Sequence, residues 1–492
     1  MTQVMQLMNF VDGRWVKSET SQYLDVIDPA TTETLASVPL STQADVERAV
    51  QAASAAWPGW RNTPASERAQ YLYRLKRLLD ENSEEIARTI TRECGKTLGE
   101  ARGDLQRGIE NVEVACGVPT LLQGYLSEDI APGIDEIMIR QPVGVVAAIT
   151  PFNFPAMIPF WFLPYAIACG NCFILKVSER TPLTMSKVFG LIEQLKLPPG
   201  VLQLVNGSKE AVDALLDAPG VRAISMVGST PVAKYIYSRA TQNGKRAQCQ
   251  GGAKNPVVVL PDCDLDMTTK ILADSAFGCA GQRCLAASIV ITVGDAQKKF
   301  TEAIVRVAQE RKVGCGLDDG VQMGPVISAA SKTRIEGLIQ QGAAEGGSIL
   351  VDGRNAKVAG FERGYFVRPT VIDGLPAAGE VARTEIFGPV LTLLHANNLD
   401  QAIALVNQGT YGNMACLFTS NGPAARQFRH DVRAGNIGIN LGVAAPIAYF
   451  PFTGWKDSFF GDLHAQGSDA IDFYTEKKVV IERWPKEWSR TF

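Results

Sequence analysis

The chain has 492 residues, of which 46% are hydrophobic and 20% charged, and its formal net charge is −3. This length exceeds one ordinary hydrophobic core, so we expect two or three domains. The near balance of charge excludes a basic surface that would hold nucleic acid without regard to sequence.

The opening third of the chain is predicted to be largely helical. Residues 41–57 carry alanine, valine and tryptophan at helical spacing behind a Ser41 N-cap. The same spacing predicts a second helix over 64–92 and a third near 97–117, which contains Arg107.

The apolar segment 145–177 is long enough to span a membrane, but its prolines and the Gly170–Asn171 pair interrupt it. A strand, a loop, a buried helix and a second strand fit this segment better, so we expect no membrane span. Strands and helices alternate from residue 143 to about 229, which is typical of a parallel sheet. A second alternating series begins at 255, so the sequence predicts two α/β domains with a boundary near 250.

Two segments are predicted to be extended outside these series: residues 121–141 and the tail around "EKKVVIERW". Strands of this kind either pair with the sheet of another subunit or form an edge strand on the same chain. The sequence pattern alone leaves both possibilities open.

Ten cysteines are spread through the chain, and the N-terminus lacks the apolar core of a signal peptide. We therefore expect a reduced, cytoplasmic protein. The three histidines, His395, His430 and His464, are far apart, which argues against a His-centred metal site or a Ser-His-Asp hydrolase. The sequence predicts no metal site and directs attention to cysteine and carboxylate chemistry.

Two strand ends carry residues suited to a ligand. Gly228 and Ser229 end one strand directly before a helix, whose first N–H groups could face a phosphate. Lys176 and Glu179 follow a neighbouring strand, where the carboxylate could bind ribose hydroxyls. No GxGxxG occurs, so an ordinary strand-to-helix connection and a solvated strand end are the alternatives.

The cysteines differ in their surroundings. Cys169 and Cys172 form a CxxC inside an apolar run, which favours buried structural thiols. Cys284 instead follows the glycine-punctuated stretch "GCAGQR" and has Arg283 beside it. A cation lowers the pKa of a thiol from its free value of about 8.5 and makes it a better nucleophile, although such a pair also arises by chance.

The pieces "TPFNFP", "LKVSERTP", "VGST", "GGAKNPVVV", "GQRCLA", "EIFGPV" and "GINLG" follow one another in the order typical of the aldehyde dehydrogenase superfamily. On these motifs, nearly the whole chain resembles that family. The resemblance implies an aldehyde-dehydrogenase-like α/β fold and a homo-oligomer, either dimer or tetramer. The implied parts are a Rossmann-type NAD-binding domain over 1–120 and 142–250, a catalytic domain over 251–465, and a β oligomerisation ribbon and tail over 121–141 and 466–492.

The resemblance also implies roles for individual residues. Cys284 would be the nucleophile, and Asn153 with the backbone N–H of Cys284 would form the oxyanion hole. Glu179 would favour NAD over NADP, because a carboxylate repels a ribose 2′-phosphate. The expected cofactor-binding residues are Thr150, Phe152, Lys176, Glu179, Arg180, Gly228, Ser229, Glu385 and Phe387.

One position departs from the hydrolytic members of the family, which carry a glutamate base where "QCQGGAKN" has Gln250. An amide cannot accept the proton of an attacking water. Its presence resembles the branch in which coenzyme A takes the acyl group. Within that branch, "QRGIENVE", "GLDDGV" and "FPFTGWKDSFFGD" resemble the methylmalonate-semialdehyde dehydrogenases, in which two arginines clamp the substrate carboxylate. The matching positions are Arg107 and Arg283.

The sequence therefore predicts an NAD-dependent, CoA-acylating oxidation of malonate or methylmalonate semialdehyde to acetyl-CoA or propionyl-CoA. Gln282 and Pro256 depart from the narrower pattern, so a non-acylating dehydrogenase of another short anionic aldehyde, carboxylated or sulfonated, is the alternative. A non-catalytic protein on the same scaffold is disfavoured, because it would need none of Cys284, Asn153 and Glu385 together.

Overall fold

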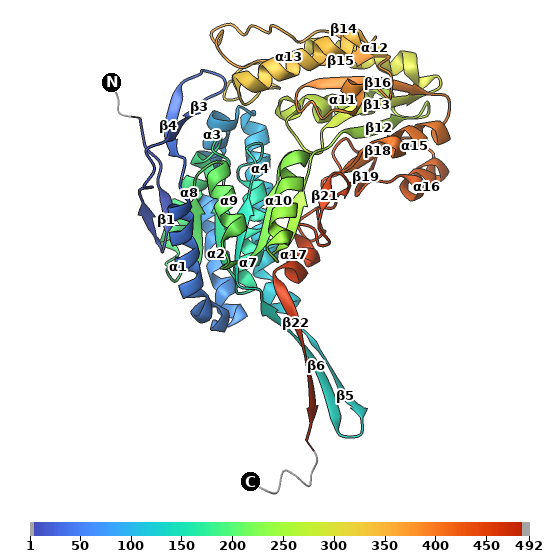
Figure 1. Ribbon diagram of the computed structural model, residues 1–492. Coiled ribbons are helices and arrows are strands. Elements are labelled where there is room, and N and C mark those ends of the chain that lie inside the picture. Colours follow the sequence, from blue (N-terminus) through green and yellow to red (C-terminus); the bar gives the residue numbers. More distant parts are fainter. Residues whose placement is uncertain (1–3, 485–492) are drawn as a thin grey trace, which may run out of the picture.

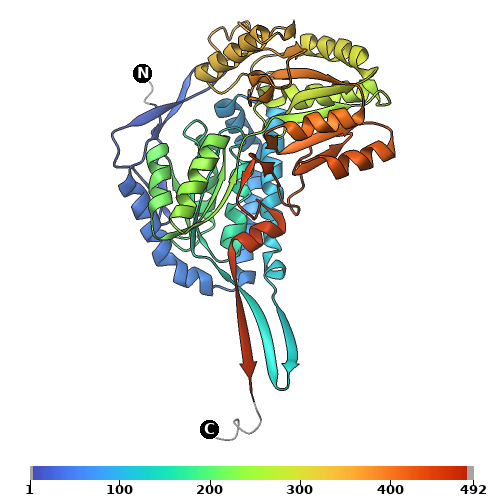
Figure 2. The ribbon, with the colours of Figure 1, turned by 45° about the vertical axis from the view of Figure 1, so that its right-hand side comes forward.

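The computed structural model describes residues 4–484, which form two large sheets with covering helices and a projecting ribbon (Figures 1 and 2). The strands are β1 (Asn9–Val11), β2 (Arg14–Val16), β3 (Tyr23–Ile27), β4 (Thr34–Pro39), β5 (Tyr125–Ala131), β6 (Ile134–Pro142), β7 (Val145–Ile149), β8 (Cys172–Lys176), β9 (Leu202–Val205), β10 (Val221–Val227), β11 (Arg246–Gln250), β12 (Asn255–Val259), β13 (Ala287–Val293), β14 (Ser348–Val351), β15 (Thr370–Asp373), β16 (Val390–Ala396), β17 (Tyr411–Gly412), β18 (Met414–Phe418), β19 (Asn436–Ile439), β20 (Trp455–Lys456), β21 (Phe459–Phe460) and β22 (Thr475–Arg483). The helices are α1 (Gln43–Asn62), α2 (Ala65–Glu81), α3 (Ser83–Cys94), α4 (Leu98–Cys116), α5 (Val118–Leu121), α6 (Met157–Phe160), α7 (Leu163–Ala168), α8 (Leu183–Gln194), α9 (Lys209–Asp217), α10 (Thr230–Gln242), α11 (Leu265–Phe277), the 3-10 turn η1 (Gly278–Gly281), α12 (Ala296–Glu310), α13 (Ala329–Ala344), α14 (Glu380–Arg383), α15 (Leu399–Gln408), α16 (Gly422–Asp431) and α17 (Gly467–Phe473).

The N-terminal sheet has the strand order β2-β1-β9-β8-β7-β10-β11-β21. Its five central strands are parallel, as the alternation of strands and helices predicts, and the edge pairings of β1 and β21 are antiparallel. Every residue of β7 and β8 is buried, because helices cover both faces of the sheet. Successive strands run outward from β7 on one side and from β10 on the other. The carboxyl ends of β7, β8 and β10 therefore meet at the switch point where open α/β sheets bind ligands.

The C-terminal sheet has the strand order β14-β15-β16-β13-β12-β18-β19. β11 ends the first series at Gln250 and β12 begins the second at Asn255, so the sheets change over close to residue 250. The chain crosses back to the N-terminal sheet at β21, which pairs with β11. We propose that the two domains follow the two sheets, with β21 as a short excursion out of the 251–465 segment.

The predicted extended segments form a separate three-stranded sheet, the ribbon, in the order β22-β6-β5. It projects from the body of the molecule, beyond the N-terminal sheet (Figures 1 and 2). The three strands pair antiparallel with one another within one chain. Neither of the two predicted segments is therefore an edge strand of a large sheet. The helix α17 links the ribbon to the body by packing on α7. Residues 485–492 of the expected tail lie outside the described residues.

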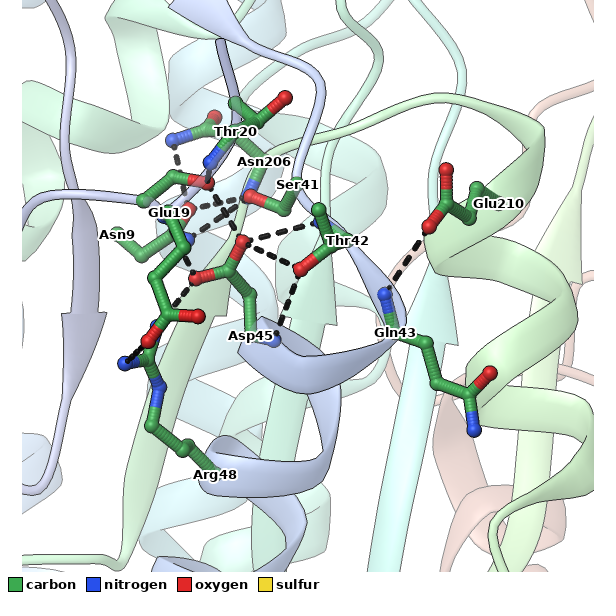
Figure 3. Close-up of polar contacts among 11 residues, drawn as sticks. Asn9, Glu19, Thr20, Ser41, Thr42, Gln43, Asp45, Arg48, Asn206 and Glu210 are labelled. Carbon is green, nitrogen blue, oxygen red and sulfur yellow. Dashed lines mark hydrogen bonds and ion pairs between the residues drawn. The ribbon is translucent and has the colours of Figure 1, made fainter.

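The strands β1–β4 were not apparent in the sequence. They are short. β3 and β4 pair with each other, and Asn9 of β1 contacts the segment before α1 and the residue after β9 through its side chain (Figure 3). The Asn9 side chain donates to Ser41 Oγ at 2.9 Å and accepts from the Asn206 N–H at 2.8 Å. The predicted Ser41 N-cap is wrong for this reason: Thr42 caps α1 in a capping box with Asp45.

The other helices follow the apolar spacing with local differences. The segment predicted as one helix over 64–92 is two, α2 and α3, with a break at Asn82. The segment 145–177 forms β7, α6, α7 and β8, as its prolines require. Among residues 4–484, no helix combines the length and the apolar character that crossing a bilayer demands.

Candidate active site

Cys284 lies in the loop between η1 and β13, at the end of α11. The turn before it is tight, because Cys279, Ala280 and Gly281 all have positive φ. A Cβ on Gly281 would lie 2.0 Å from Gly388 O, so only glycine lets this turn touch the 384–388 segment. The backbone carbonyl of Cys284 accepts from the Asn255 and Asn413 side chains at 2.8 and 3.0 Å. Asn255 begins β12 and Asn413 directly precedes β18, so the nucleophile loop is fixed at the start of two neighbouring strands of the C-terminal sheet.

A cavity of about 350 Å³ opens on Cys284. Its wall includes both predicted arginines, Arg107 from α4 and Arg283 from the nucleophile loop. The remaining lining is largely apolar, with three carboxylates. It comprises Glu100, Gly103, Asp104, Glu110, Asn111, Phe154, Met157, Trp161, Cys279, Leu285, Val443, Ala445, Pro446, Ala448, Phe452 and Gln466. Residues far apart in sequence therefore form one pocket with two guanidinium groups and two thiols, those of Cys279 and Cys284.

The arginines have different partners. Arg107 donates to Glu110 Oε2 at 2.9 Å and to Ala445 O at 3.4 Å. Arg283 makes one weak contact, to Cys279 Sγ at 3.4 Å, which leaves donors of its guanidinium facing the cavity. The sequence did not reveal the carboxylates beside them. Glu100 had a readable signal, the T-x-x-E capping box that begins α4, and its Oε1 accepts from the Cys279 N–H at 2.6 Å.

Asn153 lies in the loop after β7, and its side chain points toward the nucleophile loop. Its Nδ2 donates to the backbone carbonyl of Gln282 at 3.0 Å. Because an amide carries two N–H groups, one remains for a group bound near Cys284. The structure thus brings Cys284 and both arginines to one cavity and ties Asn153, which is not part of the cavity wall, to the loop two residues before Cys284.

Burial raises the pKa of the Cys284 thiol to about 12, although Arg283 beside it acts in the opposite direction. Arg283 thus lowers the pKa of the thiol, as the sequence predicts, but burial has the larger effect in the ligand-free site. Removing the thiolate from water costs more than one neighbouring guanidinium returns. At neutral pH the resting nucleophile is a thiol.

The predicted cofactor residues of the N-terminal sheet gather at its switch point. Lys176 ends β8 and pairs with Glu179, with 3.3 Å between Nζ and Oε2. Burial opposes ionisation of Glu179, but Lys176 holds the pKa of the carboxyl below its usual value. Thr150, at the end of neighbouring β7, has a buried Oγ1 with no hydrogen-bond partner. Arg180 is exposed on the turn after β8, and its backbone N–H donates to Ser178 Oγ.

Gly228 and Ser229 follow β10, and Ser229 is the N-cap of α10 without a side-chain cap bond. The first N–H groups of α10 are therefore available to an anion. Glu385 and Phe387 lie in the loop between α14 and β16, which belongs to the C-terminal sheet. Glu385 Oε1 accepts from the Ala253 N–H at 2.8 Å, and the Phe387 ring meets the Phe152 ring edge-on with centroids 5.9 Å apart.

The aldehyde dehydrogenase family profile matches residues 15–480 of the chain. The chain belongs to the aldehyde dehydrogenase family. It is 47% identical over 479 residues to a malonate-semialdehyde dehydrogenase of Halalkalibacterium halodurans, covering 97% of this chain and 98% of that one. A malonate-semialdehyde dehydrogenase of Pseudomonas aeruginosa is 46% identical over 484 residues, covering 98% of this chain and 97% of that one.

Solved structures give the same result for the fold. The methylmalonate-semialdehyde dehydrogenase of Oceanimonas doudoroffii superimposes with a TM-score of 0.97 at 45% identity, covering 99% of this chain and 100% of that one. A protein of Sinorhizobium meliloti, solved in complex with NAD, has a TM-score of 0.97 at 41% identity, covering 99% of each chain. The predicted aldehyde-dehydrogenase-like α/β fold is confirmed.

One feature distinguishes this aldehyde dehydrogenase from the hydrolytic pattern. Gln250 is buried at the end of β11, and its Nε2 donates to Phe452 O at 2.8 Å while its Oε1 is buried without a partner. No carboxylate stands at this position.

Within residues 4–484, no group of three histidine, cysteine or acidic side chains is arranged to hold a metal ion, and Cys169 and Cys172 are buried, free thiols.

Proposed function

We propose that this aldehyde dehydrogenase performs the NAD-dependent, CoA-acylating oxidation of malonate or methylmalonate semialdehyde. The products are acetyl-CoA or propionyl-CoA, formed through a thioacyl group on Cys284 with loss of the substrate carboxylate. The observation that carries this proposal is the single cavity of about 350 Å³ lined by Cys284, Arg107 and Arg283. The two guanidinium groups suit an anion and Cys284 presents a nucleophile in the same cavity, as a short semialdehyde acid requires.

The residues of the cavity act in order. Arg107 and Arg283 bind the substrate carboxylate and so direct its aldehyde carbon toward Cys284. The Cys284 thiol gives its proton to solvent as the sulfur bonds to that carbon, and the electron pair of the C=O bond moves onto the aldehyde oxygen, which becomes negatively charged. Asn153 Nδ2 and the backbone N–H of Cys284 stabilise this oxyanion. The apolar walls exclude water, which strengthens both interactions.

The residues at the switch point fit NAD. The free first turn of α10, after Gly228 and Ser229, suits a pyrophosphate. Glu179 with Lys176 suits the adenosine ribose. Thr150 Oγ1 is buried without a hydrogen-bond partner and could bind a polar group of the cofactor. Phe152, Arg180, Glu385 and Phe387 complete the proposed set. When bound, NAD would accept the hydride that the substrate carbon gives up.

Coenzyme A is the proposed acyl acceptor because of Gln250. An amide cannot take a proton from water, and its Nε2 is already engaged with the carbonyl of Phe452. The relatives in Halalkalibacterium halodurans and Oceanimonas doudoroffii, named for malonate and methylmalonate semialdehyde, support the choice of substrate. A thiol such as that of coenzyme A attacks a thioester without such a base once it is ionised.

The second candidate is a non-acylating NAD-dependent dehydrogenase of another short anionic aldehyde, carboxylated or sulfonated. The arginines favour it equally, because guanidinium groups bind both kinds of anion. It requires another route for releasing the acyl group from Cys284.

NADH formation and products, measured over a panel of short semialdehydes with and without coenzyme A, test the proposal. We expect turnover that depends on coenzyme A and an acyl-CoA product by mass spectrometry. Equal turnover without it, with a free acid as product, would establish the second candidate instead. A Cys284→Ala variant that kept dehydrogenase activity would refute both.

We also propose a homo-oligomer, dimer or tetramer, assembled through the ribbon, and a cytoplasmic location. The ribbon exposes apolar side chains outside the body of the molecule, including Tyr125, Leu126 and Ile481. All ten cysteines are free thiols, which fits a reducing compartment.

A further inference from the structure

A buried ion pair lies behind the loop that carries Asn153. Lys96, just before α4, has its Nζ 3.0 Å from Asp104 Oδ2, and both side chains are almost fully buried. The same Nζ donates to the backbone carbonyl of Asn153 at 2.6 Å and lies 3.9 Å from the centre of the Phe154 ring. The other carboxylate oxygen, Asp104 Oδ1, accepts from the Met157 N–H at 2.8 Å. The pair therefore grips the segment 153–157 at both ends.

Stability alone does not explain this arrangement. Removing two charges from water costs several kcal/mol per ion, and well-packed apolar side chains often serve a core equally well. Burial favours the neutral amine, yet the Asp104 carboxylate holds the pKa of Lys96 above its usual value, so the lysine is charged. What the pair adds is a fixed position for two backbone groups of one loop.

That loop carries the amide assigned to the oxyanion hole. The Asn153 carbonyl is bound by Lys96, while its side-chain Nδ2 donates to Gln282 O, two residues before Cys284. With its carbonyl fixed on one side and its amide on the other, Asn153 has little freedom to turn. An oxyanion donor must lie within about 0.5 Å of its productive position to be effective.

We infer that the Lys96–Asp104 pair is a positioning device for the oxyanion donor Asn153, and that it acts on addition of Cys284 to the aldehyde rather than on cofactor binding. Asp104 also lines the cavity that opens on Cys284, whereas Lys96 does not, and the inference gives neither residue a contact with the reacting atoms. The inference rests on the proposed function, because it requires an oxyanion at Asn153.

A double-mutant cycle tests this inference. Lys96→Met is made in the wild type and in Asn153→Ala, and the rate of the first NADH turnover is measured by stopped flow with malonate semialdehyde. We expect Lys96→Met to slow that turnover about 10²-fold when Asn153 is present. In the Asn153→Ala background the further loss should be about threefold or less, since there is no donor left to position. The Kd for NAD should not change.

The matched control is Lys245→Met. Lys245 is also a buried lysine that donates to two backbone carbonyls, those of Ala218 and Val221. It lies at the amino end of β11, whereas the proposed ligand site lies at the carboxyl ends of the strands. We expect its loss to lower the thermal midpoint and leave the first turnover unchanged. Asp104→Asn enters the same cycle if Lys96→Met does not fold.

Two results would overturn the inference: equal losses in both Asn153 backgrounds, or a loss for Lys96→Met no larger than for Lys245→Met. Failure of the proposed function would give a different result. In that case the wild type itself would form no NADH with any short semialdehyde, whatever the variants did.

Discussion

The resting state of Cys284 has a direct chemical consequence. Burial raises the pKa of this thiol to about 12, above the pKa of about 8.5 of a free cysteine. Below its pKa, the thiolate fraction rises tenfold with each pH unit. We therefore expect alkylation of Cys284 by iodoacetamide in the ligand-free enzyme to accelerate about tenfold per unit from pH about 7 to about 9.

Peptide mass spectrometry measures this reaction at Cys284 separately from the other thiols. A small cysteine peptide is the control, and its rate should level off near pH 9, close to its own pKa. A plateau for Cys284 near neutral pH would mean that Arg283 outweighs burial and that the thiolate is present without ligand.

The arginines test the identity of the substrate anion. Arg107→Leu removes one guanidinium from the cavity, and a hydrogen bond to a charged group contributes about 1.5–3 kcal/mol. We expect KM for malonate semialdehyde to rise about 10- to 100-fold, while KM for propanal, which has no carboxylate, stays within about twofold. Steady-state NADH formation with both aldehydes measures the difference.

Arg102→Leu is the matched control for that variant. Arg102 is on the same helix, α4, but it is exposed and paired with Glu84 outside the cavity. It should leave both KM values unchanged. An equal rise for both aldehydes in Arg107→Leu would remove Arg107 from carboxylate binding.

Among the elements, the turn η1 is where a small change should have the largest effect. A Cβ on Gly281 would lie 2.0 Å from Gly388 O and 2.8 Å from Pro389 N, and its φ is +69°. Gly281→Ala must therefore move either the nucleophile loop or the segment that carries Glu385 and Phe387. We expect it to slow the first NADH turnover at least about tenfold and to lower the thermal midpoint.

Gly320→Ala separates backbone strain from this collision. Gly320 has a similar φ of +75°, but a Cβ there meets nothing within 4 Å. It should cost about 1–2 kcal/mol of stability through strain and leave turnover unchanged. If both glycine variants behaved alike, the contact between η1 and Gly388 would have no role in the site.

At the same scale, the sequence predicts the elements whose apolar spacing is long and regular. The alternation from β7 to β10 and the helix α4 were readable because burial on a face imposes a period. The short strands β1–β4 were not, since β3 and β4 pair with each other and β1 is held by contacts to β9 and Asn206, which lie far away in sequence. The break at Asn82 was missed because apolar spacing continues across it from α2 into α3.

For the whole molecule, motifs place the site residues, and only folding reveals their environment. Cys284, Asn153 and the arginines follow from the resemblance, whereas the high pKa of Cys284 depends on burial by several segments. The Lys96–Asp104 pair was missed for the same reason. Lys96 precedes α4 and Asp104 lies within it, eight positions later. Nothing in that spacing shows that the two side chains contact the loop after β7.

The ribbon gives the prediction that belongs to the assembled molecule. In β22, Val479 and Ile481 are 56% and 66% exposed, which a lone chain would not favour for a strand standing away from the body. Burying a carboxylate in an apolar interface costs several kcal/mol. We therefore expect the wild type to be a homo-oligomer and the double variant V479E/I481E to have a lower mass by light scattering after size exclusion. Tyr73→Glu, a charge placed at a 54% exposed aromatic on α2, is the control and should leave the mass unchanged. A monomeric wild type, or an unaltered mass in the double variant, would show that the ribbon does not assemble the protein.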